Sequence, residues 1–169
     1  KLAKLETLTL AHGKHASPED GMCFNEACAW LAGEAHSDHP ECMCPVIARA
    51  TMRLNDRIHG DEIRTELMRP LLLKVIGTRA SREVMIKRGF VAADYAVRVF
   101  APMALEARGK LALAKLLREC RPIVGRKTAL EGKNASDAAS VSASAAYDAS
   151  AAAAYAAYAA ASANAYAVA

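Results

Sequence analysis

Apolar side chains along most of the chain recur at intervals of three and four residues, the spacing of amphipathic helices. Ser17-Pro18-Glu19-Asp20 predicts the start of one such helix, because serine caps helix N-termini and proline suits the first helical position. Gly21 weakens this start and allows a shift to Asp20, and Gly33 is placed to end the helix. Its wide apolar face consists of Cys23, Phe24, Ala27, Cys28, Trp30 and Leu31.

Four more helices are predicted downstream. Pro45 opens the first, against which we expect Trp30 to be buried, and the next begins at Asp61 and must kink or restart at Pro70. Ser81 caps a long helix that ends at Gly109. Their repeating apolar positions are Ile47, Ala50, Leu54 and Ile58; Ile63, Leu67 and Met68; Val84, Val91, Tyr95 and Val99; and, in the last helix, Leu113, Leu116, Leu117 and Cys120.

No run of alternating apolar and polar residues reaches the length of a strand, so the sequence predicts an all-α protein. Residues 121–134 are rich in charge and glycine and predict a mixed connection. We therefore expect a globular bundle of about five helices over residues 1–134, followed by one long helix over residues 135–169.

The C-terminal segment 135–169 contains 20 alanines, 6 serines and 4 tyrosines. Alanine is the best helix former, and a helix of this length spans about 50 Å at ~1.5 Å per residue. Tyr147, Tyr155, Tyr158 and Tyr166 fall on one stripe with an 11-residue period. The helix either packs on its own domain or on a second copy, or it binds a partner through these tyrosines. An ice-binding helix and low-complexity disorder are further alternatives, although regularly spaced threonines are missing.

Between His12 and Asp56 lie four of the five cysteines and four of the five histidines. Zinc prefers four such ligands, commonly as two close pairs. The candidate ligands are His36, His39, Cys42, Cys44 and, from the preceding helix, Cys23. Their spacing does not match a zinc finger, because no Cys-x-x-Cys is present. Buried thiols in an ordered polar loop are the alternative, and in that case we expect no cofactor.

The same segment holds the candidates for acid–base chemistry. Glu26 lies three residues after Cys23, on the same side of the predicted helix, and is the best candidate for a buried carboxylate that bonds the loop backbone. Asp38 next to His39 resembles an acid-oriented histidine, but neighbours in sequence rarely face each other, and local capping beside Pro40 explains the pair equally. No catalytic residue is assigned.

Charge is distributed unevenly along a chain whose formal net charge is +4. All 22 lysines and arginines lie at or before Lys133, whereas the last 35 residues carry only Asp137 and Asp148. The basic part lacks an Arg/Lys block, so nucleic-acid binding is not indicated. We see neither a signal peptide nor a lipophilic span, which leads us to expect a cytoplasmic protein with five reduced cysteines.

One resemblance covers most of the chain. It is carried by His12-Gly-Lys-His15, Ser17-Pro18, Asp20-Gly21-x-Cys23, Ser37-Asp38-His39-Pro40-x-Cys42 and Cys44-Pro45-Val46-Ile47, and it extends through Asn55-Asp56, Gly77-Thr78, Ala93-Asp94-Tyr95 and the alanine-rich tail. With these residues the chain resembles a group of uncharacterised proteins of bacterial and phage genomes. The resemblance implies that the His/Cys segment, the helices and the tail belong together, and it supplies no catalytic residues.

These observations favour a protein that acts by binding and assembly rather than by turnover. Its C-terminal helix is expected to mediate self-association or contact with a protein partner. A metal-binding domain or metal-dependent enzyme centred on residues 12–44 is the alternative.

Overall fold

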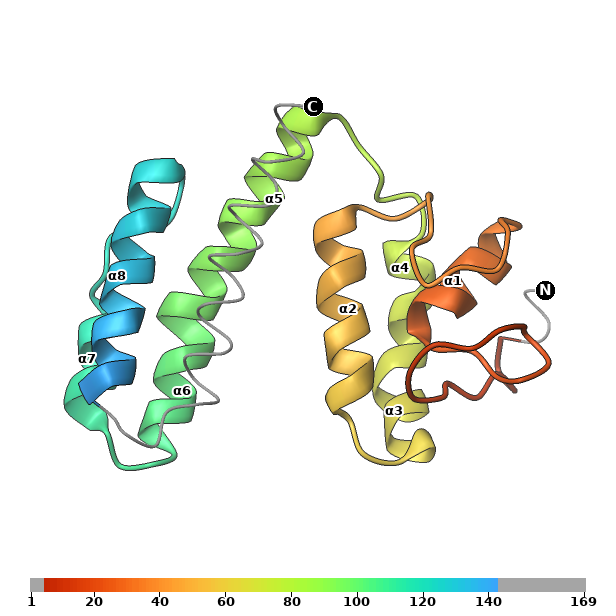
Figure 1. Cartoon of the computed structure of the whole chain (residues 1–169), viewed down its shortest axis with the longest axis horizontal. Coiled ribbons are helices and arrows are strands. Elements are labelled where there is room, and N and C mark those ends of the chain that lie inside the picture. Colours follow the sequence, from red (N-terminus) through yellow and green to blue (C-terminus); the bar gives the residue numbers. More distant parts are fainter. Residues whose placement is uncertain (1–4, 143–169) are drawn as a thin grey trace. The chain divides into compact units, whose positions relative to one another are not determined.

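The computed structural model describes residues 5–142 and divides the chain into two compact units, Lys1–Ala80 and Ser81–Ala169 (Figure 1). The described residues form helices, turns and loops without a strand, so the all-α prediction is confirmed. The division after Ala80 lies inside the segment 1–134 that we expected to be one domain. We describe each unit by itself.

Unit 1 contains helices α1 (Phe24–Ala32), α2 (Pro45–Arg57), α3 (Asp61–Met68) and α4 (Leu72–Val75). Pro45 begins α2 as predicted, and the 3-10 turn Arg69–Leu71 separates α3 from α4. Pro70 lies in this turn, which confirms that the helix restarts there. The short helix α1 packs against both α2 and α4 (Figure 1).

Helix α1 begins later than the sequence predicts. Cys23, not Ser17, is its N-cap residue, and the Ser17 hydroxyl instead donates to the Asp20 carboxylate at 2.9 Å. Gly21 has a φ of 123°, a conformation that interrupts a helix and that L side chains rarely adopt. The chain therefore turns at Gly21 before α1 starts, whereas the predicted end at Gly33, with a φ of 81°, is confirmed.

The core of unit 1 is formed by α1 and by side chains that reach it from the other helices and the loops. Its fully buried members include Leu10, Phe24, Met43, Met68 and Leu72. Trp30, which we expected to be buried, packs at the edge of this core and is only partly buried. Six of the nine residues of α1, from Phe24 to Ala29, are buried, and Trp30 follows them near the exposed C-terminal end of the helix.

Unit 2 is built around one long helical rod. Helix α5 (Arg82–Tyr95) continues through the π-helical turn Ala96–Phe100 into α6 (Ala101–Glu106). The Ser81 hydroxyl accepts the N–H of Val84 and caps α5 as predicted, and Gly109 ends the unit after α6 with a φ of 70°. The wider turn before Pro102 accommodates a residue that lacks an N–H and whose ring needs space in the preceding turn.

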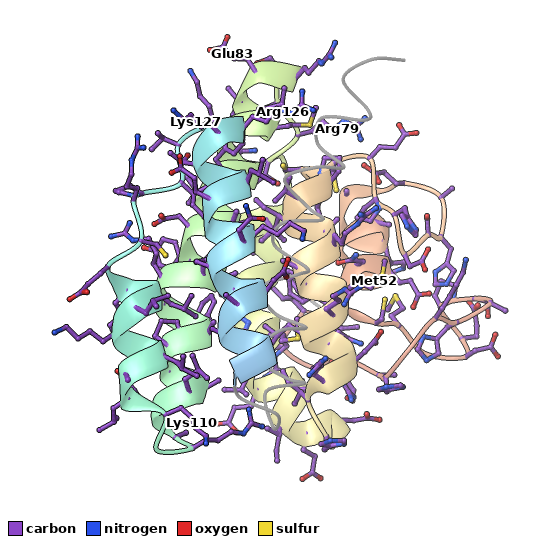
Figure 2. The ribbon with its side chains drawn as sticks, turned by 60° about the vertical axis from the view of Figure 1, so that its left-hand side comes forward. Met52, Arg79, Glu83, Lys110, Arg126 and Lys127 are labelled. Carbon is purple, nitrogen blue, oxygen red and sulfur yellow. The ribbon has the colours of Figure 1, made fainter. Side chains whose placement is uncertain are left out.

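Two shorter helices, α7 (Leu111–Arg118) and α8 (Arg126–Ser142), pack against this rod. Figure 2 labels Glu83, Arg126 and Lys127 at the end of the unit where α5 and α8 begin, and Lys110 at the opposite end. Helices α5 and α8 therefore run in the same direction, and α7 runs back between their ends (Figures 1 and 2).

Much of the predicted connection 121–134 is helical, and α8 crosses the expected boundary between residues 134 and 135. The Thr128 hydroxyl caps the start by accepting the N–H groups of Val124 and Gly125 at 3.1 and 3.2 Å. Gly132 packs so closely that an added Cβ would lie 2.7 Å from the Ile123 side chain. The glycine that suggested a loop thus permits close packing of a helix.

A fully buried arginine joins three parts of unit 1. Arg64 in α3 donates to the carbonyl oxygens of Asn55 at 2.8 Å, Ile58 at 2.6 Å and Leu10 at 3.4 Å, and it pairs with Asp61. The end of α2, the following turn and the N-terminal segment therefore depend on one guanidinium for their buried acceptors.

We expect Arg64→Met to lower the free energy of unfolding of unit 1 by about 3 kcal/mol, because buried carbonyl groups lose their donors. Urea unfolding followed by the fluorescence of Trp30, the only tryptophan, measures this unit. The exposed Arg57 in α2 offers a control, and Arg57→Met is expected to change the stability by less than about 0.5 kcal/mol. Equal effects of the two substitutions would contradict the role assigned to Arg64.

Candidate functional site

The His/Cys segment surrounds a buried carboxylate on the first turn of α1. Glu26 is inaccessible to solvent and accepts the backbone N–H groups of Cys23 and His15, each at 2.8 Å. His15 Nδ1 lies 2.9 Å from the same carboxylate. The prediction that Glu26 is buried and bonds the loop backbone is confirmed, and the bonds attach residues 15–23 to the helix.

A second histidine approaches from the loop after α1. His36 Nε2 lies 3.1 Å from the carbonyl oxygen of His15 and 3.7 Å from Glu26 Oε1. Both partners are acceptors, so Nε2 carries a proton, and the buried Nδ1 of His36 has no hydrogen-bond partner. By the same argument His15 donates from Nδ1 to the ionised Glu26.

The pKa of Glu26 lies below its ordinary value. Burial alone pushes this pKa upward because it penalises the charged form. The hydrogen bonds from the backbone of His15 and Cys23 and from the His15 ring outweigh burial, since they stabilise the carboxylate. Glu26 is therefore an ionised acceptor whose lone pairs are engaged.

The predicted zinc ligands do not meet at this place. Cys23 and Cys44 are buried, Cys42 is half-buried, and His39 is exposed with Nδ1 2.7 Å from Asp38. Of the five predicted ligands, Cys23 and His36 lie next to the Glu26 carboxylate, Cys23 through its backbone N–H at 2.8 Å and His36 at 3.7 Å. In the part of the chain that the structure describes, no group of three or more His, Cys, Asp and Glu residues is arranged to hold a metal ion. Zinc binding stays a prediction, and elemental analysis of the purified protein tests it.

Three cysteines of the segment, Cys23, Cys28 and Cys42, are protonated thiols. Burial raises the pKa of Cys23 to about 12, and it also raises the pKa of Cys28 and Cys42. A thiolate is the form that attacks electrophiles and binds metals, so these side chains behave as small apolar groups. All five cysteines of the chain are free.

Two buried amides complete the framework, and the sequence did not single them out. Asn25 donates to the carbonyl oxygens of Asp38 and Ala48 at 2.9 and 2.8 Å. Asn55 accepts the N–H of Phe24 at 3.1 Å and donates to the carbonyl of Ala11 at 3.0 Å. The polar residues around α1 thus provide hydrogen-bond partners for backbone N–H and carbonyl groups of the two loops. This arrangement stabilises the fold of the loops. Asparagine in a helix interior is the one signal that could have identified them.

Unit 2 carries a different candidate surface, on the outer face of its rod. We call this face the apolar stripe; it consists of Val84, Val91, Tyr95, Phe100 and Met103, all exposed. The rings of Tyr95 and Phe100 lie 6.2 Å apart between centroids, in contact range for aromatic pairs. Lys87 and Arg88 lie between Val84 and Val91 at helical spacing, so the uninterrupted apolar part of the stripe runs from Val91 to Met103. An exposed apolar patch of this kind is a candidate interaction surface.

The opposite face of the same rod is buried and built from small residues. Its members are Gly89, Ala93, Ala96, Val97, Ala101 and Leu105, which pack against α7 and α8. The rod is therefore apolar on two sides, and only one of them is used within the unit.

The four predicted contact tyrosines, Tyr147, Tyr155, Tyr158 and Tyr166, lie outside the described residues. Among the helices that are described, none combines the length and the apolar character needed to cross a membrane. Comparison of the chain with protein-family models, with curated proteins and with solved structures gave no match. The resemblance to bacterial and phage proteins stays a prediction.

We expect Glu26→Gln to destabilise unit 1 by about 2 kcal/mol at pH 7, because an amide cannot accept all the donated hydrogen bonds. The folded-state pKa of Glu26 is lowered, so its contribution is complete above the unfolded value of about 4.3 and is lost as the pH falls through the folded-state pKa. The difference between the wild type and the variant should therefore shrink from pH 7 to pH 3.

The exposed Glu19 provides the control, since Glu19→Gln leaves the Glu26 hydrogen bonds unchanged. Urea unfolding at several pH values, followed by Trp30 fluorescence, gives both stabilities. A Glu26→Gln deficit that is independent of pH would show that the ionised carboxylate is not what stabilises the loops.

Alkylation of the native protein at pH 7.5 should leave Cys23 and Cys28 unmodified, because both thiols are buried and have raised pKa values. The partly exposed Cys42 and Cys120 should react first. Mass spectrometry after alkylation in denaturant should then find five modified cysteines. Rapid native modification of Cys23, or a stoichiometric disulfide, would contradict this prediction.

Proposed function

We propose that this chain is a non-enzymatic helical assembly protein that self-associates through unit 2 and its alanine- and tyrosine-rich tail. The observation that carries the proposal is the apolar stripe on the outer face of the α5–α6 rod. Burying such side chains is favourable by about 25 cal/mol for each Å² of apolar surface removed from water. A second protein surface supplies that burial.

The chemistry of unit 1 supports a binding role over turnover. The Glu26 carboxylate is engaged by His15 and Cys23, and the amides of Asn25 and Asn55 are bonded to the loop backbone. The cysteine thiols nearby are protonated. These groups hold the loops on α1. We therefore assign unit 1 a structural role and unit 2 the self-association.

The tail is the second component of the proposed assembly. Its first residues, 135–142, lie in α8, and only Asp137 and Asp148 carry charge after Lys133. Alanine faces allow a neighbouring helix to approach closely, and tyrosines are frequent anchors at protein interfaces. Tyr147, Tyr155, Tyr158 and Tyr166 are the proposed contact residues.

The full-length protein should have a mass above 18.0 kDa in light scattering at micromolar concentration. The double substitution Val91→Lys, Tyr95→Lys should lower that mass, because two charges would be buried in the contact. These positions are i and i+4 on α5 and have exposed fractions of 56% and 53%, so the substitutions do not disturb the core of unit 2.

A matched control lies in α3, where Ile63 and Leu67 are also i and i+4, with exposed fractions of 55% and 58%. The double substitution Ile63→Lys, Leu67→Lys should leave the mass unchanged. Circular dichroism confirms that each variant is folded. A wild-type protein whose mass stays at 18.0 kDa at micromolar concentration would refute self-association.

A further inference from the structure

We propose that unit 2 binds the phosphate backbone of a nucleic-acid duplex at the end where helices α5 and α8 begin. This inference goes beyond the proposed self-association and does not depend on it. It rests on the charge of unit 2, on the ion pairs that use part of this charge, and on the place of the cations outside those pairs.

The positive charge of the chain belongs to unit 2. Residues 81–142 contain twelve lysines and arginines and six acids, a formal net charge of +6. Residues 1–80 contain ten lysines and arginines and eleven acids, a formal net charge of −1. The overall charge of +4 conceals this division, which becomes visible only with the boundary after Ala80. A domain with such an excess of one sign attracts polymers of the opposite charge.

Ion pairs within unit 2 engage all six acids of its described residues. The pairs are Glu83–Lys87, Asp94–Arg98, Glu106–Arg118, Lys115–Glu119, Arg121–Glu131 and Lys133–Asp137. Each acid thereby offsets one cation. The net charge of +6 is therefore not compensated by the residues that carry it, and an external anion can supply the balance.

Three cations outside these pairs gather at one end of unit 2. Arg82 is the first residue of α5, and Arg126 and Lys127 are the first two residues of α8. Figure 2 labels Arg126 and Lys127 at the end where Glu83 lies, and α5 and α8 pack against each other. The three side chains are exposed, and the described part of the chain offers none of them an ion-pair partner. We call Arg82, Arg126 and Lys127 the cationic end.

The fold assembles this surface from distant parts of the chain. Arg82 and Arg126 are 44 residues apart in the sequence, so together they form no Arg/Lys block. The sequence therefore did not indicate nucleic-acid binding. The packing of α8 on α5 brings the starts of the two helices to the same end of the unit.

The surroundings of the cationic end add positive charge. Two acids lie in the first two turns of α5 and α8, and each is engaged by a different cation: Glu83 by Lys87 at 2.6 Å and Glu131 by Arg121 at 3.5 Å. Each helix start also carries a partial positive charge from backbone N–H groups. Cations are disfavoured at such starts, and an anion bound there relieves the repulsion.

The side chains near the cationic end favour a duplex over other polyanions. The large apolar residues exposed next to the two helix starts are Val84 and Val124. Single strands are held by bases that stack on aromatic rings, and membrane-surface helices insert rings or leucines. The exposed ring of Tyr95 lies 13 residues beyond Arg82, about 20 Å along the rod. Cations without rings beside them fit the regularly spaced phosphates of a duplex.

The test titrates the full-length protein into fluorescein-labelled DNA and RNA duplexes of equal length and follows fluorescence anisotropy at several NaCl concentrations. Three phosphate contacts for each unit 2 should give a slope of log Kd against log salt of about 2.7. Raising NaCl from about 50 to about 200 mM should then weaken binding by about 40-fold. Both duplexes carry the phosphate backbone, and the ratio of their Kd values identifies the one that fits better.

A double substitution locates the contact. Arg126→Gln with Lys127→Gln should lower the slope by about 1.8, because two phosphate contacts are lost. Lys115→Gln with Lys133→Gln is the matched control. It removes the same charge from exposed positions whose cations already pair with Glu119 and Asp137, so the slope should stay unchanged. Circular dichroism and light scattering verify that both variants keep the fold and the mass of the wild type.

The other outcomes overturn distinct statements. Equal slopes for the two double variants refute the cationic end as the site. Absence of binding to both duplexes at about 50 mM NaCl refutes the proposal. Tighter binding to a single strand of the same length, or binding to vesicles of phosphatidylcholine and phosphatidylserine without binding to duplexes, refutes the duplex as the partner. The light-scattering mass of the wild type reports separately on self-association.

Discussion

The loops of unit 1 depend on one requirement, that buried backbone groups must find hydrogen-bond partners. Residues 5–23 and 33–44 contain no helix of their own that could satisfy these groups. Polar side chains from the helices take that place: Glu26 accepts from the loop before α1, Asn25 donates to the loop after it, and Arg64 donates to the N-terminal segment. Two histidines of the segment, His15 and His36, belong to the same network and lie next to the Glu26 carboxylate, where they support irregular backbone around a short buried helix.

Unit 2 follows a different principle, in which small residues decide the packing. Ala93, Ala96 and Ala101 allow α7 and α8 to approach the rod, and Gly132 permits close contact with Ile123. Larger apolar residues then remain on the outer face of the rod. This distribution is the opposite of a helix whose bulky side chains fill its own core. It leaves unit 2 with an apolar surface that is exposed on the rod.

The two units therefore differ in what they contribute. In unit 1 the charged and polar groups are engaged in holding the chain, and the cysteine thiols are kept protonated by burial. In unit 2 large apolar side chains, among them Val91 and Tyr95, are exposed on the outer face of the rod. The proposed assembly role rests on this surface.

Local sequence determined the elements whose signals act within a few residues. Pro45 and Ser81 begin helices, Gly33 and Gly109 end them, and Pro70 forces a restart, because backbone geometry and capping are short-range effects. The position of Glu26 relative to Cys23 was sufficient to predict a buried carboxylate that bonds the loop.

Tertiary structure decided the rest. The face of α5 that packs inward could not be read from periodicity, since both faces are apolar and only the small residues admit α7 and α8. Helix α8 occupies much of the segment that we expected to be a connection. Gly132 looked like a loop signal in the sequence, but in the folded unit its missing side chain lets the helix pack closely on Ile123. His15 and His36 are 21 residues apart and meet Glu26 only when two loops close over α1. Such contacts join residues distant in sequence, and spacing along the chain carries no information about them.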